Sequence, residues 1–507
     1  MSFARTFSRA LLGMQAPEVV VEVHLSNGLP SFSIVGLPET SVKESKDRVR
    51  SALVNSNFIF PDSRITVNLA PADLPKDGGR FDLAIAVGIL LASGQMQNTD
   101  MDNYEFYGEL ALSGEVRTVR AILPSIMAAT SVNRCCFIPQ VDDELASLIE
   151  NANRKAITSL QEVWLDLSGQ QALPFNQIYN NENMSNVESP QSEFDLCDVK
   201  GQQQGKRALE IAAAGSHNLL FLGPPGTGKS MLAQRMTGIM SEMTNSEALE
   251  TAAVYSITGQ QVNLQNWKKR PFRNPHHTCS AVALVGGSST PKPGEISLSH
   301  NGILFLDELP EFDRKVLDSL REPMETGKVM ISRAARQSEF PARFQLIAAL
   351  NPSPTGCHTD KRASPDQVLK YLSKISGPFI DRIDLQVELP KLSSKKLQSQ
   401  EVGETSKQVK NRVDTARKIQ LNRQNKANAH LTNKEISKYC ILDEKSLSYL
   451  AKVSEKLGLS PRSYHRIIKV SRTIADLNSC QHIDIAHLKE ALSYRCFERF
   501  LAQLAKV

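Results

Sequence analysis

One octapeptide constrains this chain more than any other stretch: Gly223-Pro-Pro-Gly-Thr-Gly-Lys-Ser230. It matches the phosphate-loop pattern G-x-x-x-x-G-K-[ST] at every fixed position. The apolar run 218–222 precedes it like a buried strand, and residues 231–236 follow at helical spacing. A glycine loop between a strand and a helix presents backbone N–H groups and the positive end of the helix dipole to phosphate. The sequence therefore predicts a nucleoside triphosphate site, rather than a glycine-rich turn that matches by chance.

Two further candidate strands end in polar side chains suited to this site. Asp307 and Glu308 follow the apolar residues of Gly302-Ile-Leu-Phe-Leu, and Asn351 follows the run 344–350. Parallel α/β sheets bind ligands at the carboxyl ends of their strands. We expect ATP and Mg²⁺ as cofactors, with Asp307 holding the metal shell through water and Glu308 acting as general base toward the attacking water.

These motifs resemble those of the AAA+ ATPase superfamily, and the resemblance implies further roles. Asn351 matches its first sensor, Arg462 its second sensor, and Arg382 an arginine finger that acts on a neighbouring subunit's nucleotide. A finger implies a ring; the alternative is that Arg382 pairs with Asp381 or Asp384. The expected catalytic set is Lys229, Asp307, Glu308, Asn351, Arg382 and Arg462, with Ser230 and Asp307 at the Mg²⁺ ion. The expected nucleotide-binding set is Val199, Gln202, Gly223, Pro224, Pro225, Gly226, Thr227, Gly228, Lys229, Ser230 and Met231, of which Val199 and Gln202 lie near the adenine.

The N-terminal 168 residues are predicted to form a mixed α/β domain. Apolar alternation predicts strands and apolar periodicity predicts helices: the strands over 19–25, 31–36, 65–69 and 108–112, the helices over 41–55, 82–91 and 124–129. The stretches 75–83 and 108–116 resemble the protease domain of the Lon family and its ribosomal-protein-S5-like relatives. In that alignment the nucleophilic serine falls on Arg80 and its activating lysine on Leu123. We expect a Lon-like fold without proteolysis, in which Arg80 forms a surface ion pair or contacts a partner or DNA.

Composition divides the remainder of the chain. Residues 169–193 are rich in Gln, Asn and Ser and are predicted to be a polar linker. Residues 194–392 are predicted to form the AAA+ parallel-sheet ATPase core, and residues 393–507 a helical lid and C-terminal domain. The predicted fold class is therefore α/β, with a Lon-protease-like, ribosomal-S5-like α+β domain at the N-terminus, a parallel-sheet AAA+ core and a helical C-terminal lid.

Extra sequence between the phosphate loop and Asp307 indicates which branch of the AAA+ superfamily the chain resembles. Residues 270–278 and 284–298 resemble the helix-2 insert of magnesium-chelatase motor subunits and minichromosome-maintenance helicases. Residues 321–333 fit a helix followed by the hairpin that precedes the first sensor in the same group. Taken over its whole length, the chain resembles the YifB/ComM family of magnesium-chelatase-like proteins. That resemblance implies an ATP-driven homo-hexameric ring that acts as a DNA branch migration helicase and helps to integrate incoming DNA in natural transformation.

For DNA contact the sequence offers two basic loops. They carry Lys292 in the insert and Lys328, Arg333 and Arg336 in the hairpin. Lysine and arginine without interleaved aromatics suit phosphate contact, so we expect binding of single-stranded or branched DNA without sequence preference, with recombination proteins as partners. A basic run from Lys391 to Lys426 is interpreted as a solvated helix face, with a phosphate-binding surface as the alternative.

Two functions from other classes remain open. A magnesium-chelatase-like protein-remodelling or metal-insertion ATPase would share the nucleotide site, although no metal-binding partner domain is recognisable. An ATP-dependent protease is disfavoured by Arg80 and Leu123 at the expected serine and lysine positions.

Composition excludes several other classes. No apolar run approaches the ~20 residues of a membrane span, and the first ten residues do not resemble a signal peptide, so we expect a cytoplasmic protein without membrane contact. The eight cysteines form no C-x-x-C pair and are expected to be reduced. Cys357 with His358 is too small a set for tetrahedral zinc, and the consecutive pair His276-His277 is expected to have a structural or substrate-contact role.

Overall fold

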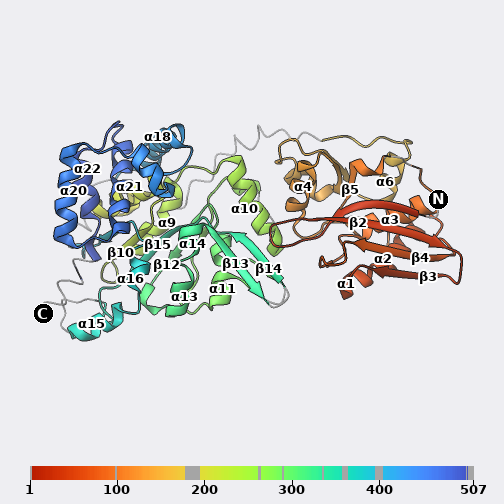
Figure 1. The fold of residues 1–507 in the computed structure, drawn as a ribbon, viewed down its shortest axis with the longest axis horizontal. Helices are drawn as coiled ribbons and strands as arrows, with labels where there is room; N and C mark the ends of the chain where they lie inside the picture. The colour runs from red at the N-terminus through yellow and green to blue at the C-terminus, as the bar shows by residue number, and fades with distance from the viewer. Residues whose placement is uncertain are drawn as a thin grey trace. The chain divides into compact units, whose positions relative to one another are not determined.

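A computed structural model describes residues 3–97, 100–176, 194–260, 264–287, 291–333, 336–356, 364–393, 403–497 and 500. The chain divides into two compact units, and Figure 1 labels many of their helices and strands. The first unit comprises Met1–Val187, Asn245–Trp267 and Ser332–Phe340, and the second comprises Glu188–Thr244, Lys268–Ile331 and Pro341–Val507. Compactness does not test the predicted domain boundaries at 168, 193 and 392, which stay predictions.

The first unit is built around a four-stranded sheet with the order β1-β2-β4-β3. Its strands are β1 (Phe3–Arg9), β2 (Glu18–Ser26), β3 (Ser31–Val35) and β4 (Arg64–Ala70). The pairs β1–β2 and β2–β4 are antiparallel, and β3 pairs with β4 in parallel. Val19, Val21 and Val23 are fully buried at alternate positions of β2, as expected for a strand with one face in the core.

One face of this sheet is covered by α3 (Asp82–Ala92), which is apolar on all sides and almost wholly buried. The helix approaches the sheet closely at Gly88, where a Cβ atom would lie 2.6 Å from the Val23 Cγ2 atom. The Thr6 hydroxyl donates to the Ala84 carbonyl at 2.9 Å, and the buried Asp82 carboxylate pairs with Arg48 at 2.7 Å. The predicted helix over 82–91 is therefore confirmed as the core helix of this unit.

A parallel three-stranded sheet, β5-β8-β9, completes the α/β character of the first unit. Its strands and the hairpin beside it are β5 (Tyr104–Phe106), β8 (Cys135–Pro139), β9 (Arg154–Ile157), β6 (Glu109–Leu110) and β7 (Val116–Arg117). The helices are α1 (Thr40–Lys43), α2 (Ser45–Asn55), α4 (Ile122–Ser131), α5 (Asp143–Ala146) and α6 (Leu160–Leu167). The strand predicted over 108–112 is reduced to the two residues of β6, and β1, β5, β7, β8 and β9 were not predicted.

The expectation for Arg80 was wrong. Its side chain is 3% exposed and donates hydrogen bonds to the backbone carbonyls of Arg9 at 3.1 Å and Arg120 at 2.6 Å. Burial lowers the pKa of this guanidinium to about 10, although Asp77 opposes the shift. Lys76 is buried too and bonds the Pro71 carbonyl. Because it is buried, Arg80 is neither a surface ion-pair partner nor a ready DNA contact; it joins two distant segments of the unit.

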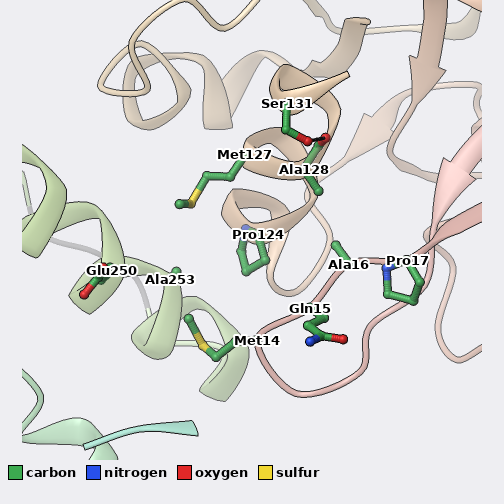
Figure 2. A pocket seen from close by; sticks show the side chains of 10 residues that line it. All are labelled: Met14, Gln15, Ala16, Pro17, Pro124, Met127, Ala128, Ser131, Glu250 and Ala253. Carbon is green, nitrogen blue, oxygen red and sulfur yellow. Dashed lines mark hydrogen bonds between the residues drawn. The ribbon is translucent and has the colours of Figure 1, made fainter. Parts of the chain in front are cut away.

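Residues 245–267 belong to the first unit although they follow the phosphate-loop helix in sequence. They include α10 (Asn245–Thr258), which packs on α4: Ala252 joins the core cluster of Ile122 and Ile126, and the Ala121 N–H donates to the Ser256 carbonyl at 3.1 Å. A pocket of about 480 Å³ lies at this junction. Figure 2 shows its lining, with Met127 pointing from α4 toward α10. Its lining is Met14, Gln15, Ala16, Pro17, Pro124, Met127, Ala128, Ser131, Glu250 and Ala253. None of these is a predicted nucleotide or DNA residue.

The second unit contains a five-stranded, wholly parallel sheet with the order β11-β12-β15-β10-β16. Its strands are β10 (Leu219–Leu222), β11 (Phe272–Arg273), β12 (Ile303–Leu306), β15 (Gln345–Leu350) and β16 (Leu385–Glu388). The strands β10, β12 and β15 are buried at every residue, as expected for a parallel sheet covered on both faces. The predicted mixed α/β fold with a parallel sheet is confirmed.

Helices surround this sheet and form the C-terminal region. Around the sheet lie α8 (Gln203–Gly215), α9 (Lys229–Ile239), α11 (Ala281–Val285), α12 (Glu295–Leu298), α13 (Arg314–Ser319), α14 (Pro323–Thr326), α15 (Pro365–Leu372) and α16 (Gly377–Ile380). The C-terminal helices are α18 (Ser406–Gln424), α19 (Asn433–Tyr439), α20 (Glu444–Leu457), α21 (Pro461–Leu477) and α22 (Ile485–Ser493). A hairpin, β13 (Lys328–Arg333) and β14 (Arg336–Pro341), stands where the sequence predicts one.

Most arginines of the basic run on α18 form ion pairs or hydrogen bonds with other segments of the chain. Arg412 contacts Glu210 and Glu404, Arg423 pairs with Asp476 at 2.7 Å, and Arg417 donates to the Ser216 hydroxyl at 2.6 Å. Lys407 and Lys418 are exposed, as a solvated face requires. The arginines of this run therefore tie α18 to its neighbours, which the sequence interpretation did not include.

Several predictions concern residues that are not described. They are residues 177–193 of the linker, Cys357 with His358, and Lys395 with Lys396. Within the described ranges the cysteines are free thiols, and no helix there is long and apolar enough to cross a membrane.

The structural role of Arg80 yields a stability prediction. We expect Arg80→Met to lower the stability of the first unit by ~2–4 kcal/mol, because two buried carbonyls lose a charged donor. Scanning calorimetry of the full chain should then show one transition falling by about 5–10 °C. The matched control is Arg117→Met on exposed β7, which should melt like the wild type. An unchanged melting profile in Arg80→Met would contradict the assigned role.

Candidate active site

The phosphate loop spans residues 223–228, between the end of β10 and the start of α9. Gly226 and Gly228 have φ angles of +76° and +89°, in the left-handed region that residues with a Cβ atom rarely adopt. These two positions turn the chain so that α9 begins at Lys229 directly beyond the strand. An eleven-residue helix that starts at the loop directs its first N–H groups and its positive dipole end toward the loop.

The Lys229 side chain is held inside this loop. Its ammonium donates to the carbonyls of Gly223 at 2.7 Å and Pro224 at 3.0 Å, and to the Asn351 side-chain oxygen at 2.9 Å. The residue is 8% exposed. Burial lowers the pKa of Lys229, and the Asp307 and Glu308 carboxylates oppose that shift. The structure thus brings Lys229 and Asn351, which the sequence assigned to one site, into direct contact, because β10 pairs directly with β15.

Ser230, in the first turn of α9, lies next to Asp307, which follows β12. The Ser230 hydroxyl donates to the Asp307 carboxylate at 2.5 Å, so the two oxygens predicted to bind Mg²⁺ are already neighbours. A hydroxyl and a carboxylate are hard oxygen ligands of the type that Mg²⁺ prefers, and the few protein ligands leave room for water and phosphate oxygens. The residues present therefore fit the expected Mg²⁺ ion.

Glu308 stands at the end of β12 with an unusual backbone. Its φ and ψ angles are 52° and 48°, a left-handed conformation that is costly for a residue with a side chain and is frequent at functional sites. The side chain is 51% exposed, and its Oε2 atom lies 3.4 Å from Nδ1 of His277. His277 is in turn packed edge-on against Phe312. Glu308 is thus accessible to a water molecule and is oriented by a histidine that the sequence reading had not placed beside it.

The residues that lead into α8 reach the phosphate loop. Gln202 donates from its side-chain amide to the carbonyls of Thr227 at 3.1 Å and Pro390 at 2.9 Å. Val199 is 3% exposed and belongs to the hydrophobic core of the second unit. Gln202 therefore borders the loop, and the adenine contact of both residues stays a prediction.

Arg382 lies in the segment between α16 and β16 and is held by two contacts. It pairs with Glu325 of α14 at 2.8 Å and donates to the Pro378 carbonyl at 2.6 Å. Its side chain is 7% exposed. The partner is neither of the two carboxylates considered from the sequence, Asp381 and Asp384. To act on a neighbouring subunit, Arg382 would have to exchange Glu325 for that subunit's phosphate.

Arg462 occupies the first turn of α21 and is exposed. Ser460 caps this helix by accepting the Ser463 N–H at 3.2 Å, and Pro461 stands at its first position, as the sequence pattern S-P-R-S indicates. The exposed position leaves Arg462 available to a ligand. Its role as second sensor stays a prediction.

The candidate DNA residues lie on the predicted insert and on the hairpin. Lys292 is exposed, and its backbone carbonyl accepts the Gly287 N–H at 3.0 Å. Lys328 is exposed at the start of β13. Arg333 and Arg336 end β13 and begin β14, and their side chains are outside the described part of the structure.

Sequence reasoning singled out His277 without placing it beside Glu308, and it missed Glu325. The His277 signal was available, because the run Asn274-Pro-His-His-Thr278 leaves a strand beside the one that carries Asp307 and Glu308. No local pattern marks Glu325 as the partner of Arg382, because the two residues are brought together only by the packing of their loops. Groups of His, Cys, Asp and Glu that could hold a metal ion without substrate are absent from the described residues.

Three family models named for a magnesium chelatase subunit match most of the chain. Residues 195–397 match the model described as "Magnesium chelatase, subunit ChlI", residues 21–142 match "Subunit ChlI of Mg-chelatase", and residues 403–495 match "Magnesium chelatase, subunit ChlI C-terminal". The first of these matches contains the phosphate loop, Asp307, Glu308, Asn351 and Arg382.

Curated relatives align over the full length. The chain is 54% identical to the competence protein ComM of Haemophilus influenzae, with 100% of both chains covered. It is 49% identical to the YifB protein of Salmonella typhimurium and 48% identical to that of Escherichia coli, again with 100% of each chain covered.

The site geometry predicts separate effects for two substitutions. We expect Glu308→Gln to bind ATP normally and to lose turnover by about a hundredfold or more, because an amide cannot accept the proton of the attacking water. Lys229→Ala should lose ATP binding itself, because the loop loses its cation. Fluorescent-nucleotide titration and phosphate-release assays measure the two effects. Wild-type turnover in Glu308→Gln would show that another residue is the base.

Proposed function

The chain belongs to the YifB/ComM family of magnesium-chelatase-like proteins, and on that premise we propose that it is an ATP-driven hexameric ring motor acting on DNA. Its specific role is that of a branch migration helicase in the cytoplasm that helps to integrate incoming DNA during natural transformation. The magnesium-chelatase-like core implies ATPase activity. The observation that carries the DNA role is the 54% identity, over the whole chain, to a protein named for competence.

The ATPase chemistry is supported by the arrangement around Lys229. Its ammonium would exchange the carbonyls of Gly223 and Pro224 for phosphate oxygens, while the loop N–H groups and the α9 dipole hold the remaining charge. Ser230 and Asp307 would hold Mg²⁺, which would supply positive charge against the triphosphate. Glu308 takes the proton of the attacking water, and Asn351 orients that water from the end of β15.

Action on DNA is supported by the exposure of Lys292 and Lys328. Both are lysines without aromatic neighbours in sequence, which suits contact with phosphates and not with base edges. These two lysines can therefore contact the phosphates of a DNA backbone of any sequence. This matches a motor that moves a branch point along unrelated sequences.

A second candidate function comes from the family models, which are named for a magnesium chelatase subunit. A protein-remodelling or metal-insertion motor would use the same nucleotide site. Proteolysis has no such support, because buried Arg80 and Leu123 stand where the serine and lysine are expected.

Strand displacement from a synthetic Holliday junction separates the candidates. The proposed function requires that the wild type dissociate a labelled junction into duplex products with ATP and not without it. Glu308→Gln should leave the junction intact. An active ATPase that leaves every junction intact, with single-stranded and duplex arms both tested, would favour the remodelling motor.

The DNA path gives a prediction about salt dependence. We expect Lys292→Ala and Arg333→Ala each to reduce the salt slope of DNA binding by about one unit, almost equally for all sequences, because one phosphate contact is lost. Strand displacement should fall while basal ATPase survives, since neither residue belongs to the nucleotide site. Lys445→Ala, at an exposed lysine on α20, is the matched control. Unchanged affinity and unwinding in both variants would place the DNA contact elsewhere.

The ring gives a prediction about mixtures. If Arg382 acts on the neighbouring subunit, then Arg382→Ala mixed with Lys229→Ala should recover ATPase activity, because some interfaces contain neither defect. Mass photometry verifies that mixed rings form. Activity no higher than that of the two separate variants, in rings proved to be mixed, would rule out action in trans.

A further inference from the structure

The segment that follows Arg382 is anchored by a buried carboxylate. Asp384 is 3% exposed, and its Oδ1 atom accepts a hydrogen bond from Arg466 of α21 at 2.6 Å. Its Oδ2 atom accepts the backbone N–H of Asn218, the residue before β10, at 2.9 Å. His217 Nδ1 lies 3.8 Å from the same oxygen. One side chain thus joins the Arg382 segment, the strand that leads to the phosphate loop, and α21.

The charge of Asp384 is maintained in this setting. Burial alone would raise the pKa of its carboxyl group, but Arg466 and His217 hold it well below its ordinary value. The carboxylate therefore stays ionised at physiological pH. The partners of a buried ion pair must keep their relative positions, because a buried charge that loses its partner carries a large desolvation cost.

A second link runs beside the first. Arg495 is 2% exposed, and it donates to the Ile383 carbonyl at 3.0 Å and to the Ser463 hydroxyl at 2.7 Å. Ile383 directly follows Arg382, and Ser463 directly follows Arg462. The main chain around Arg495 is itself fixed, because the neighbouring Tyr494 carbonyl accepts the Gln386 N–H of β16 at 2.7 Å.

Both links connect the residues just after Arg382 with the residues just after Arg462. We propose that Asp384 and Arg466 are positioning residues that hold the Arg382 segment against the first two turns of α21, so that the two arginines move as one body. This inference rests on the proposed function, in which Arg382 and Arg462 act on nucleotide. Neither Asp384 nor Arg466 belongs to the predicted nucleotide site; they transmit a displacement of α21 to the residue that works on the neighbouring subunit.

The opposite side of Arg382 offers a weaker hold. Glu325 is 43% exposed, so solvent screens its pair with Arg382 and weakens it. The buried Asp384 network is therefore the firmer of the two attachments of this segment. If Arg382 were released from Glu325, the segment would still be held against α21 by the Asp384–Arg466 pair.

Arg466→Gln is the substitution that tests this role. Arg466 is 22% exposed, so its loss leaves no cavity in the deep core, and Asp384 keeps the Asn218 N–H. We expect kcat for ATP to fall about tenfold with the dissociation constant for ATP within about twofold of wild type. Arg466→Lys, which keeps the charge, should recover most of the rate.

The matched control is Arg423→Gln, which breaks another ion pair of α21 while Asp476 keeps its contacts with Arg472 and Asn428. The kcat of this control should stay near wild type.

Combination with Arg382→Ala supplies the decisive readout. If Arg466 acts through Arg382, the double variant should turn over at the rate of Arg382→Ala alone, because the positioned group is already gone. If the two substitutions lower kcat independently, so that their fold-changes multiply in the double variant, the positioning role is overturned. An Arg466→Gln rate equal to that of the control would overturn it too. Either result leaves the arginine-finger assignment of Arg382 intact. A wild-type rate in Arg382→Ala would instead remove the finger assignment of the proposed function. Should Arg466→Gln not fold, Ser463→Ala, which removes the Arg495 contact, must show the same dependence on Arg382.

Discussion

Parallel pairing of β10 with β15 on one side and β16 on the other is the constraint on which the second unit depends. The pairing aligns Leu222 with Leu350 and with Glu388, so the phosphate loop emerges beside the residues that follow both neighbours. Asn351 thereby meets Lys229, and the Arg382 segment enters the sheet next to the strand that leads to the loop. A shift of one residue in either ladder would reverse the side-chain directions and separate these groups.

Charges near this edge are compensated within the chain. Lys229 is buried among carbonyl oxygens and an amide, Ser230 donates to Asp307, and Arg382 is paired with Glu325. Buried groups without partners would destabilise the fold, so each has a local substitute for its proposed ligand. Binding of nucleotide, or of a neighbouring subunit, would then exchange partners at little cost, which suits a site that must cycle between states.

The first unit shows a different use of a buried cation. Arg80 stands at the position that the resemblance to Lon proteases assigns to a serine, and its guanidinium binds carbonyls of two segments distant in sequence. A side chain of that size and charge fills the position and leaves no room for a nucleophile there. Its contacts are those of a structural residue, and its burial removes it as a candidate DNA contact.

The sequence alone determined the features that are local. The glycine loop, the apolar strands that end in Asp307–Glu308 and in Asn351, and the S-P-R-S start of α21 are patterns within a few residues, and the structure has each element in place. Tertiary structure decided the contacts between distant segments. His277 beside Glu308, Glu325 beside Arg382, Arg466 beside Asp384 and buried Arg80 all join residues far apart in the chain. Periodicity and spacing report which face of an element is apolar, whereas the partner of a buried charge is fixed by strand order and helix packing.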